Sequence, residues 1–403
     1  MGLNKTLLAQ IIGIMGNSAP AVRRYVGRRL QFPETSRSVA AATANSWNGR
    51  IKQISTVDVV NPSICLPGFS FDSSFEAAIP SAQVWQCAIE VTGGPTHEFT
   101  LSGSASITVT GADIIVESDP IAGLTIPAGT EYYLRWHGTI ASGSFVESGL
   151  YNNGGNVIQY ERGIDLTDKH MTGTVGLTGG YLCMPCGLKS DVSASYRCFA
   201  AIGDSIVGST DTDPMTRHLL GRFDYCKLAR SGAAATLAVA GTNYAKRRAA
   251  IQALGFTDAW VDYGINDIGG GAKTAAQTIT VLGTFYGFLT AAGVSRIYQS
   301  TVTPYSKPLD AQPAFSSSNR VSDSNQQVYS SNVATHRPTL NSTIRAHGIT
   351  GMTNHVEWAT TAENALNSDW WKATYSDDGL HPNATYGQQP IADATIAANP
   401  FAL

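Results

Sequence analysis

Three short motifs hold side chains of the types that carry out nucleophilic acyl chemistry. Ser205 follows the apolar run 198–202 in the sequence Gly-Asp-Ser-Ile. Asn266 follows a second apolar run in Gly-Ile-Asn-Asp, and His381 stands three residues after Asp378. A serine on the tight turn that leaves a buried strand is placed for attack on a carbonyl carbon. An amide can then donate to the developing oxyanion, and a carboxylate can hold the imidazole that takes the serine proton.

Taken singly, each motif is also ordinary turn chemistry. Gly-Asp-Ser forms solvated turns, and Asn266 is a residue type that tolerates a positive φ. Their order favours one shared site, because each motif stands at the end of an expected strand or before the closing helix. Asp377 is a rival to Asp378 as partner of His381, but its spacing to the histidine is four rather than three.

The second half of the chain predicts alternating strands and helices that would position these motifs. Apolar runs and helical patterns alternate through 197–206, 214–223, 257–263, 273–292, 296–302, 326–347 and 384–398. Such alternation builds a parallel sheet with helices on both faces. Because the carboxyl ends of parallel strands share one edge of the sheet, we expect the three motifs to meet there.

The first half has a different texture. From about 46 to 187 the chain consists of short runs with period-two alternation, such as 106–110 and 131–136, separated by Gly, Pro, Asn and Asp turns. This pattern is typical of an antiparallel β-sandwich. The expected division is an N-terminal helical arm over 1–35, a β-rich accessory domain over 36–190 and an α/β domain over 191–403. The last of these is expected to fold and act alone, since it holds every motif.

Composition narrows the class of protein. Charged residues make up 14% of the 403, the formal net charge is −3, and Gly is abundant at 40 residues. This balance argues against a protein that binds nucleic acid by neutralising phosphates. It suits β-rich material that is extracellular or particle-borne. No run of eighteen apolar residues occurs, which excludes a transmembrane helix.

The N-terminal segment has two interpretations. Apolar residues between 3 and 15 follow helical spacing and precede the basic cluster Arg23, Arg24, Arg28 and Arg29. Such a segment cannot bury its own apolar face, so we expect an arm for self-association or for attachment to a larger particle. The other interpretation is a weak signal peptide cleaved near residues 19–21.

Several other features have structural explanations. The pair Cys183 and Cys186 forms a C-x-x-C, but no second pair completes a zinc site, so buried thiols or one local disulfide are expected for the six cysteines. The glycines at 269–271 lack the frame of a phosphate-binding loop. His218 and His336 are expected on helix surfaces. Trp370 and Trp371 are expected either to line a cleft or to cover the core.

Together the motifs resemble those of the SGNH hydrolases, also called the G-D-S-L esterase/lipase family, over roughly 195–403. The sequence at 203–206 is similar to the first block, with Ile in place of Leu, and 264–267 matches the G-x-N-D block. The sequence at 378–381 matches the closing D-x-x-H block. The second block is the loosest match: Gly232 is its candidate, and the usual Asn upstream is replaced by Ala229-Arg230.

This resemblance implies an SGNH-type, flavodoxin-like three-layer sandwich with a parallel sheet, and a role for each residue. Ser205 would be the nucleophile, His381 the general base and then acid, and Asp378 its orienting partner. The oxyanion would be held by the backbone N–H groups of Ser205 and Gly232 and by the amide of Asn266. Loss of one such donor costs about 3–4 kcal/mol, so Asn266→Ala should lower turnover roughly a hundredfold to a thousandfold. No metal or organic cofactor is implied.

The family allows esters of sugars and lipids, thioesters and aryl esters. The preceding β-rich domain and the low charge favour removal of O-acetyl groups from a polysaccharide, with an acylated glycan as partner and no nucleic acid. The alternative is a receptor-binding component of a particle, such as a phage fibre or spike, with a glycan-directed esterase domain. A lipase or thioesterase is the third option, although no contiguous apolar lid is evident. Each of the first two implies an extracellular or virion-associated location.

Overall fold

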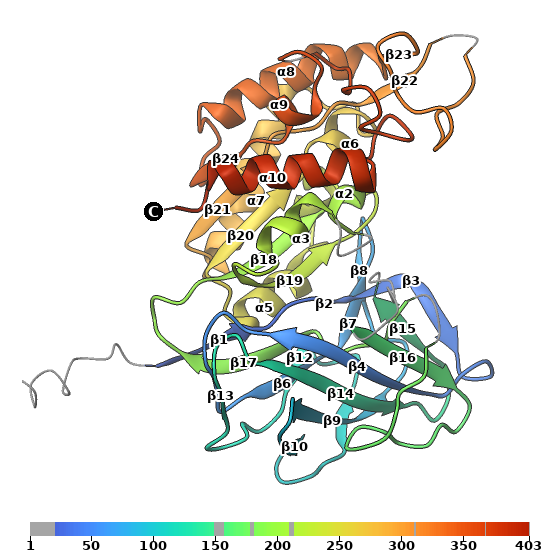
Figure 1. Ribbon diagram of the computed structural model, residues 1–403, viewed down its shortest axis with the longest axis vertical. Coiled ribbons are helices and arrows are strands. Elements are labelled where there is room, and N and C mark those ends of the chain that lie inside the picture. The colour runs from blue at the N-terminus through green and yellow to red at the C-terminus, as the bar shows by residue number, and fades with distance from the viewer. Residues whose placement is uncertain are drawn as a thin grey trace, which may run out of the picture.

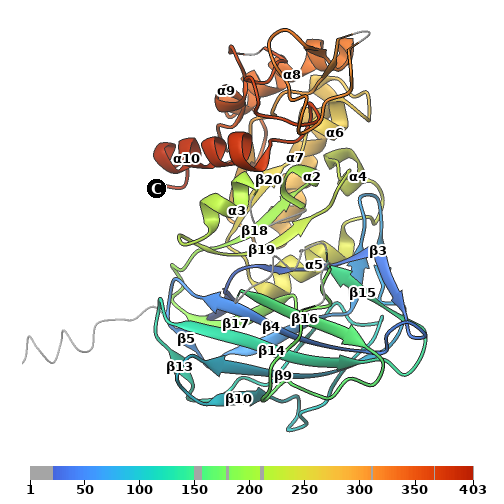
Figure 2. The same cartoon turned by 45° about the vertical axis from the view of Figure 1, so that its right-hand side comes forward.

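A computed structural model describes residues 21–148, 157–177, 181–208, 213–309, 312–366 and 368–402. It has two parts, stacked one above the other in Figures 1 and 2. The β-rich half comprises the described residues from 21 to 192, and the α/β half comprises those from 193 to 402. The predicted mixed α/β fold with a parallel sheet is confirmed for the second of these. The β-sandwich and the three-layer arrangement remain predictions.

The β-rich half is built from antiparallel sheets. One sheet has the order β1 (Val22–Val26), β17 (Gly187–Val192), β6 (Ser63–Pro67) and β12 (Ile115–Glu117). The largest has the order β10 (Thr96–Phe99), β9 (Gln83–Val91), β14 (Glu131–Thr139), β4 (Ser46–Ile54) and β16 (Ile158–Gly163), with β11 (Ile107–Val109) on β9. A third joins β15 (Ser144–Ser148), β3 (Pro33–Ala40), β7 (Phe69–Phe71) and β8 (Glu76–Ala78), and a small pair joins β13 (Thr125–Ile126) and β5 (Val59–Val60).

Two glycines make room for two indoles at the centre of the largest sheet. Gly49 on β4 lies opposite Trp136 on β14, and Gly138 on β14 lies opposite Trp47 on β4. A Cβ at Gly49 would lie 2.0 Å from the Trp136 ring, and one at Gly138 would lie 2.2 Å from the Trp47 ring. Both indoles are fully buried. Side chains of this size dominate the energy of a core, so the glycines are required by packing.

The α/β half is built on a parallel sheet. Its strands have the order β2 (Leu30–Gln31), β19 (Asp224–Ala229), β18 (Cys198–Gly203), β20 (Asp258–Asp262), β21 (Arg296–Ser300) and β24 (Asn354–Val356). Its helices are α2 (Ser205–Gly208), α3 (Pro214–Leu219), α4 (Ala235–Val239), α5 (Ala245–Leu254), α6 (Ile265–Ile268), α7 (Ala275–Ala291), α8 (Ser331–Arg345), α9 (Ala359–Ala362), the π-helical turn η1 (Ala384–Gln388) and α10 (Gln389–Ala398). Helix α10 packs on α3, whereas α7 packs on α4 and α8. Figure 1 shows α10 in front of the strands and α7 behind them.

Between β21 and α8 the chain makes a long excursion that contains a hairpin of β22 (Ser306–Pro308) and β23 (Gln326–Val328). The sequence pattern predicts a helix from 326, and this prediction is wrong for its first turn. Ser330 caps α8, because its side chain accepts a hydrogen bond from the Val333 N–H. The residues before this cap are therefore free to pair as a strand.

The predicted helical arm over residues 1–35 differs from the structure. Residues 1–20 lie outside the described residues, so the helical pattern at 3–15 stays a prediction. Residues 21–35, which the same assignment includes, form β1, β2 and the start of β3 rather than a helix. Arg23 does not belong to a free basic cluster, because its guanidinium pairs with Asp191 at 3.0 Å and with Glu117 at 3.4 Å. The expected border at 190/191 falls inside β17.

Buried polar contacts join the two halves. The Ser55 hydroxyl donates to Asp224 at 2.7 Å, and the Tyr25 hydroxyl donates to the Tyr225 carbonyl at 2.8 Å. Arg247 on α5 pairs with Glu76 on β8 at 2.8 Å, with both side chains buried. Strand β2 also extends the parallel sheet across the border, since it pairs with β19. The α/β half therefore takes one edge strand from the first part of the chain.

Candidate active site

The carboxyl edge of the parallel sheet gathers the predicted residues. Ser205 begins α2 directly after β18, with only Asp204 between the strand and the helix. The turn requires Gly203, because a Cβ there would lie 2.1 Å from a Val207 methyl and 3.2 Å from the Asp262 Cβ. As the first residue of a helix, Ser205 has an N–H without an acceptor inside that helix.

Ser205, His381 and Asp378 form a continuous chain of hydrogen bonds. The Nε2 atom of His381 lies 2.7 Å from the Ser205 Oγ, and its Nδ1 atom lies 2.6 Å from the Asp378 Oδ2. The other carboxylate oxygen of Asp378 accepts the N–H groups of Leu380 at 2.8 Å and of His381 at 2.7 Å. Asp378 thus fixes the backbone turn and the imidazole together, which gives an arrangement suited to taking the serine proton.

The pKa shifts of Asp378 and His381 agree with this geometry. Burial by itself would raise the pKa of Asp378, but the hydrogen bond and charge of His381 outweigh it and lower that pKa to about 2. Burial would likewise lower the pKa of His381, but Asp378 and, more weakly, Asp204 outweigh it, so the pKa is raised above its ordinary value. Asp378 is therefore ionised at neutral pH and stabilises the imidazolium.

The loop that carries this pair is held from beneath by Trp371. The carbonyl of Gly379 accepts the indole N–H of Trp371 and the backbone N–H of Ser306, both at 2.8 Å. Gly379 has a φ of +80°, and a Cβ there would lie 2.3 Å from the Ser306 carbonyl oxygen. Of the two tryptophans, Trp371 is fully buried and supports the loop, whereas Trp370 is 37% exposed.

Asp377 does not contact the imidazole. One of its carboxylate oxygens accepts from the Arg320 Nε at 2.8 Å and the other accepts from the Asn383 amide. Of the two adjacent carboxylates, the structure therefore places Asp378 at His381.

Asn266 and Gly232 both line a small cavity. This cavity has a volume of about 280 Å³, and its wall includes Ala234, Leu237 and Gly270. Both hydrogens of the Asn266 amide are engaged, because its nitrogen donates to Asp204 at 2.8 Å and to the Ala233 carbonyl at 3.0 Å. The sequence does not reveal this double engagement.

Two buried carboxyl groups lie at the turn that carries Ser205. Asp204 is fully buried, and burial raises its pKa to about 7, although the Ile206 N–H and the charge of His381 oppose the shift. Asp262 lies opposite Gly203 on the neighbouring strand, and burial followed by the charges of Asp204 and Asp213 raises its pKa well above the ordinary value. A carboxyl group that stays protonated near neutral pH is typical of functional sites.

Arg230 connects the Gly232 turn to the β-rich half. Its guanidinium pairs with Glu34 on β3 at 3.0 Å and donates to Ser36 at 2.7 Å. Glu34 is only 2% exposed, and its burial raises its pKa despite the two arginines beside it. The departure from the family pattern at 229–230 therefore coincides with an ion pair between the halves.

The remaining sequence candidates lie elsewhere. Within the described part of the chain, no group of three or more His, Cys, Asp or Glu side chains is placed to hold a metal ion. All six cysteines are buried free thiols, so neither a redox pair nor a disulfide forms at 183–186. The surface expectation for His218 is wrong: the ring is fully buried against Trp260 and Phe401. His336 lies half-buried on α8.

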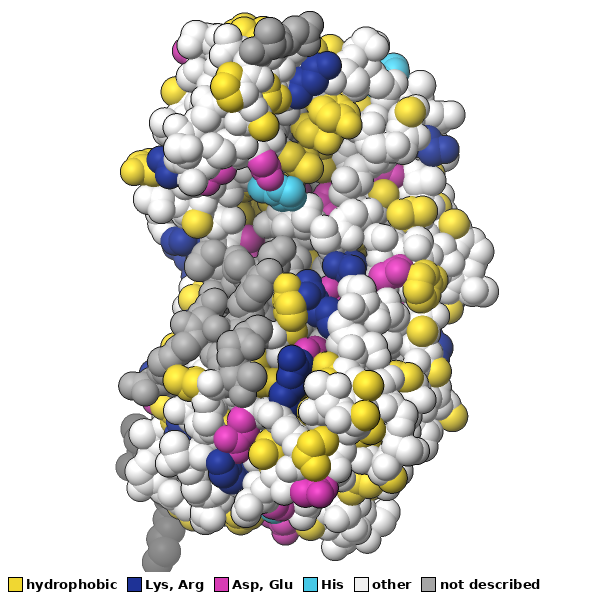
Figure 3. All heavy atoms as spheres, turned by 90° about the vertical axis from the view of Figure 1, so that its right-hand side faces the viewer, with side chains coloured by type: hydrophobic (Ala, Val, Ile, Leu, Met, Phe, Trp, Pro, Cys, Tyr) yellow, Lys and Arg dark blue, Asp and Glu magenta, His cyan; other side chains and the backbone are white. Residues whose placement is uncertain are grey.

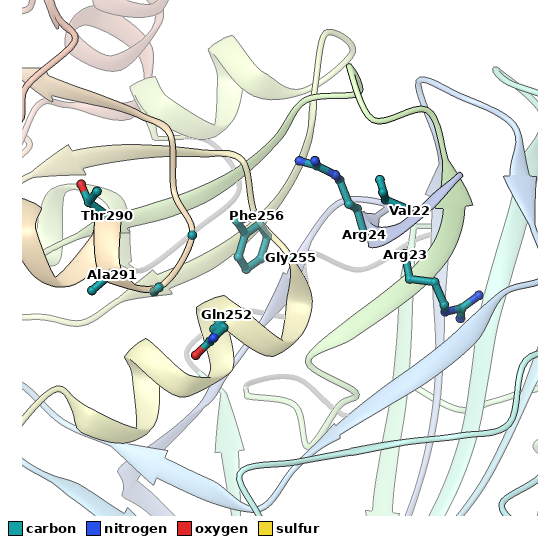
Figure 4. Close-up of a pocket in the computed structure, with 10 residues that line it drawn as sticks. Val22, Arg23, Arg24, Gln252, Gly255, Phe256, Thr290 and Ala291 are labelled. Carbon is teal, nitrogen blue, oxygen red and sulfur yellow. The ribbon is translucent and has the colours of Figure 1, made fainter. Parts of the chain in front are cut away.

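A second cavity lies near the opposite edge of the sheet. It has a volume of about 370 Å³ and is lined by residues from β1 and from the ends of α5 and α7, as Figure 4 shows. Its residues include Arg23, Arg24, Gln252 and Thr290 but none of the predicted site residues.

On the face in Figure 3, histidine and acidic side chains meet at the surface of the α/β half, with basic side chains nearer the β-rich half. Among the described helices, none is long and apolar enough to cross a membrane.

No protein-family model and no curated protein matches the sequence. Solved structures do match. A family two carbohydrate esterase from Clostridium thermocellum in complex with cellohexaose is 11% identical, with 94% of this chain and 98% of that chain covered and a TM-score of 0.35. A family 3 carbohydrate esterase from Talaromyces cellulolyticus is 18% identical, covering 50% and 96%, with a TM-score of 0.35.

A protein grouped with the lipolytic G-D-S-L family, from Desulfitobacterium hafniense, is 14% identical, covering 49% of this chain and 97% of that chain, with a TM-score of 0.35. At such scores these likenesses carry no argument about activity, which rests on the geometry above. The names agree with the resemblance read from the motifs: the solved structures to which this chain is similar include SGNH hydrolases, G-D-S-L lipolytic proteins and carbohydrate esterases.

Proposed function

We propose that this protein is a serine ester hydrolase whose nucleophile is Ser205. The observation that carries the proposal is the hydrogen-bond chain from the Ser205 Oγ through His381 to Asp378, with contacts of 2.7 and 2.6 Å. A serine is a weak nucleophile unless a base takes its proton as it attacks. His381 is that base, and Asp378 holds the tautomer in which Nε2 is free to accept.

In the first step the Ser205 oxygen attacks the ester carbonyl while His381 takes the hydroxyl proton. The negative charge that develops on the carbonyl oxygen is held by the N–H groups of Ser205 and Gly232 and by the Asn266 amide. Because both Asn266 hydrogens are engaged, the planar amide must rotate as a unit to free one hydrogen from the Ala233 carbonyl for the oxyanion. The same rotation changes its contact with Asp204, so this rearrangement is part of the step.

In the second step His381 gives its proton to the leaving alcohol, and the acyl group stays on Ser205. Water then attacks this acyl-enzyme, and His381 acts as base again. The carboxylic acid leaves and the hydroxyl is restored. Every group that these steps use belongs to the chain itself.

We propose O-acetyl groups on a polysaccharide as the substrate and an extracellular setting. The cavity beside Gly232 and Asn266 supports a small acyl group, because small residues and Leu237 line it together with the polar Thr236 and Asp267. Its volume of about 280 Å³ also admits chains longer than acetyl, so acyl length is the property to measure. Attachment to a phage fibre or spike remains the alternative setting for the same chemistry.

A substrate panel tests the function. The purified protein is assayed on acetylated oligosaccharides, on 4-nitrophenyl esters of increasing acyl length and on an acyl thioester, beside Ser205→Ala. We expect release of acetate from the oligosaccharide by the wild type and none by the variant. Equal activity of both proteins would contradict the nucleophile, and a preference for long acyl chains would contradict the acetyl assignment.

A further inference from the structure

Two stacked tyrosines lie beside the candidate active site, and the steps above assign them no role. The rings of Tyr305 and Tyr329 are parallel within 8°, with centroids 3.8 Å apart. The Tyr329 N–H donates to the Tyr305 carbonyl at 2.9 Å, and the β22–β23 hairpin joins the segments that carry them. The pair is therefore held in place by backbone contacts as well as by the ring contact.

The sheet order places Tyr305 next to the residues of the site. Gly232 follows β19, Ser205 follows β18 and Asn266 follows β20, which are adjacent strands. Tyr305 lies beyond the end of β21, the next strand in the row. Its ring edge rests on Gly269 just after α6, since a Cβ there would meet ring atoms at 2.9 and 3.0 Å.

The segment of Tyr305 is also bonded to the loop that carries the histidine, because the next residue, Ser306, donates its N–H to the Gly379 carbonyl at 2.8 Å. Burial, followed by the hydrogen bond and charge of Tyr329, raises the pKa of Tyr305, and the charge of Asp378 adds to the shift. The stack therefore lies between the helix of Asn266 and the loop of His381.

The role of His381 in the reaction indicates which part of an ester lies near the tyrosine stack. His381 must protonate the leaving oxygen, so the alcohol part of the ester lies next to the imidazole. The acyl part has the cavity beside Gly232 and Asn266. Ser306, next to Tyr305, is bonded to the histidine loop, so we expect the stack to meet the alcohol part.

Tyr329 is 38% exposed, although one face of its ring is covered by Tyr305. In the described part of the chain, no second ring and no cation lies over it. We propose that the Tyr305–Tyr329 stack is a subsite for a ring-shaped alcohol, such as the pyranose that carries the acetyl group, with Tyr329 as the contact surface. This proposal rests on the proposed function and specifies its leaving group.

Kinetics on two acetate esters with the same acyl group test the subsite. One ester is an acetylated methyl xylopyranoside and the other is ethyl acetate, which has no ring. For Tyr329→Ala we expect the KM of the sugar ester to rise roughly fivefold to tenfold, the range for loss of one aromatic contact. The kinetic constants for ethyl acetate should stay at the wild-type level. Tyr329→Phe keeps the ring and should behave as wild type on both esters.

An equal change on both esters would overturn the subsite, because it would mean that the hairpin itself is disturbed. No change on either ester would also overturn it. Binding of acetylated xylotriose to Ser205→Ala, measured by calorimetry with and without Tyr329→Ala, does not depend on turnover. A wild type that hydrolyses neither ester contradicts the proposed function, whereas equal binding of the xylotriose by both proteins contradicts the subsite.

Discussion

The site edge of the parallel sheet differs from the rest of the molecule in its buried acids, since elsewhere in both halves such acids have a basic partner, as Asp213 has Lys227 and Glu363 has Arg337. In the β-rich half, Arg135 is buried and pairs with Glu90 at 2.9 Å, and Glu90 also pairs with Arg50 at 2.8 Å. At the carboxyl edge of the parallel sheet, Asp204 and Asp262 are buried, and within the described residues neither has an ion pair with Lys or Arg. A buried pair is costly to break, whereas a buried acid without a basic partner raises the free energy of the folded state and is typical of functional sites.

The residues of the site and those of the β-rich scaffold are separated in space but not independent. The α/β half holds Ser205, His381 and Asp378, and the β-rich half holds none of the predicted site residues. Yet Glu34 of the β-rich half pairs with Arg230, two residues before Gly232. Variants in each half can therefore distinguish residues that carry out the reaction from residues that hold the site in place.

If all the chemistry lies in the α/β half, Ser205→Ala and His381→Ala should each lower kcat by about 10⁶-fold, since the two act as one unit. The double variant should be no slower than either single one. Hydrolysis of 4-nitrophenyl acetate measures the rates, and circular dichroism checks that the variants fold. A double variant far slower than both singles would show that the two residues do not act as one unit, and an active Ser205→Ala would show a second nucleophile.

The fragment 191–403 tests whether the halves are independent. The sequence predicts that it folds and hydrolyses small esters alone. The interface argues for the opposite result, because the cut removes β2 and exposes apolar side chains that the β-rich half covers, such as Phe256, which packs against Tyr25. Exposing one large buried apolar side chain costs about 1.5–3 kcal/mol, a sizeable share of the roughly 5–15 kcal/mol that stabilises a domain.

We therefore expect an unstable or insoluble fragment, measured by thermal unfolding and by ester turnover. Deletion of residues 1–20 alone is the control, since it spares every described strand. A soluble fragment with the turnover of the full chain would restore the original prediction.

Glu34→Gln tests the contact between the halves, because it removes a charge in the β-rich half that pairs with Arg230 in the α/β half. We expect kcat to fall about tenfold with KM unchanged, as the Gly232 turn loses its anchor and one oxyanion donor is less well placed. Glu90→Gln is the matched control, since it breaks a paired charge inside the β-rich half. It should lower the melting temperature without changing kcat. An equal loss of kcat in both variants would mean a general loss of structure.

The prediction for His218 concerns stability and leaves turnover at neutral pH unchanged. Burial and then the charge of Arg222 lower its pKa to about 4, from about 6.5 in the unfolded chain. The unfolded state therefore binds more protons between these values, so stability falls by about 3 kcal/mol as pH drops from 6.5 to 4. Asp204 acts in the opposite direction, since its raised pKa costs stability as pH rises from about 4 to about 7.

His218→Phe should remove the acid-sensitive part, because a phenyl ring fits against Trp260 and Phe401 without a proton to bind. Urea unfolding at pH 4.5 and at pH 7.5 measures the difference for both proteins. The same loss at low pH in wild type and variant would assign the acid sensitivity to other groups.

The parallel α/β sheet and the residues that meet at its edge can be predicted from the amino-acid sequence. Strong alternation of apolar and helical segments is a local signal, and the carboxyl ends of parallel strands share an edge whatever their order. Helix α7 was predicted at 273–292 and is found at Ala275–Ala291, where a capping box of Thr274 and Gln277 begins it. The position of Ser205 after its strand followed from the same signal.

The partners of the buried polar groups can be identified only in the folded chain, because they are far away in the sequence. Glu34 lies 196 residues before Arg230, and no local pattern connects them. His218 was misplaced although it shares a helix face with Met215 and Leu219, since a polar residue type was given more weight than its spacing. Tyr329 was absent from every motif and became a candidate only when the hairpin set its ring on Tyr305. Packing and burial depend on contacts between distant segments, and only the folded chain specifies them.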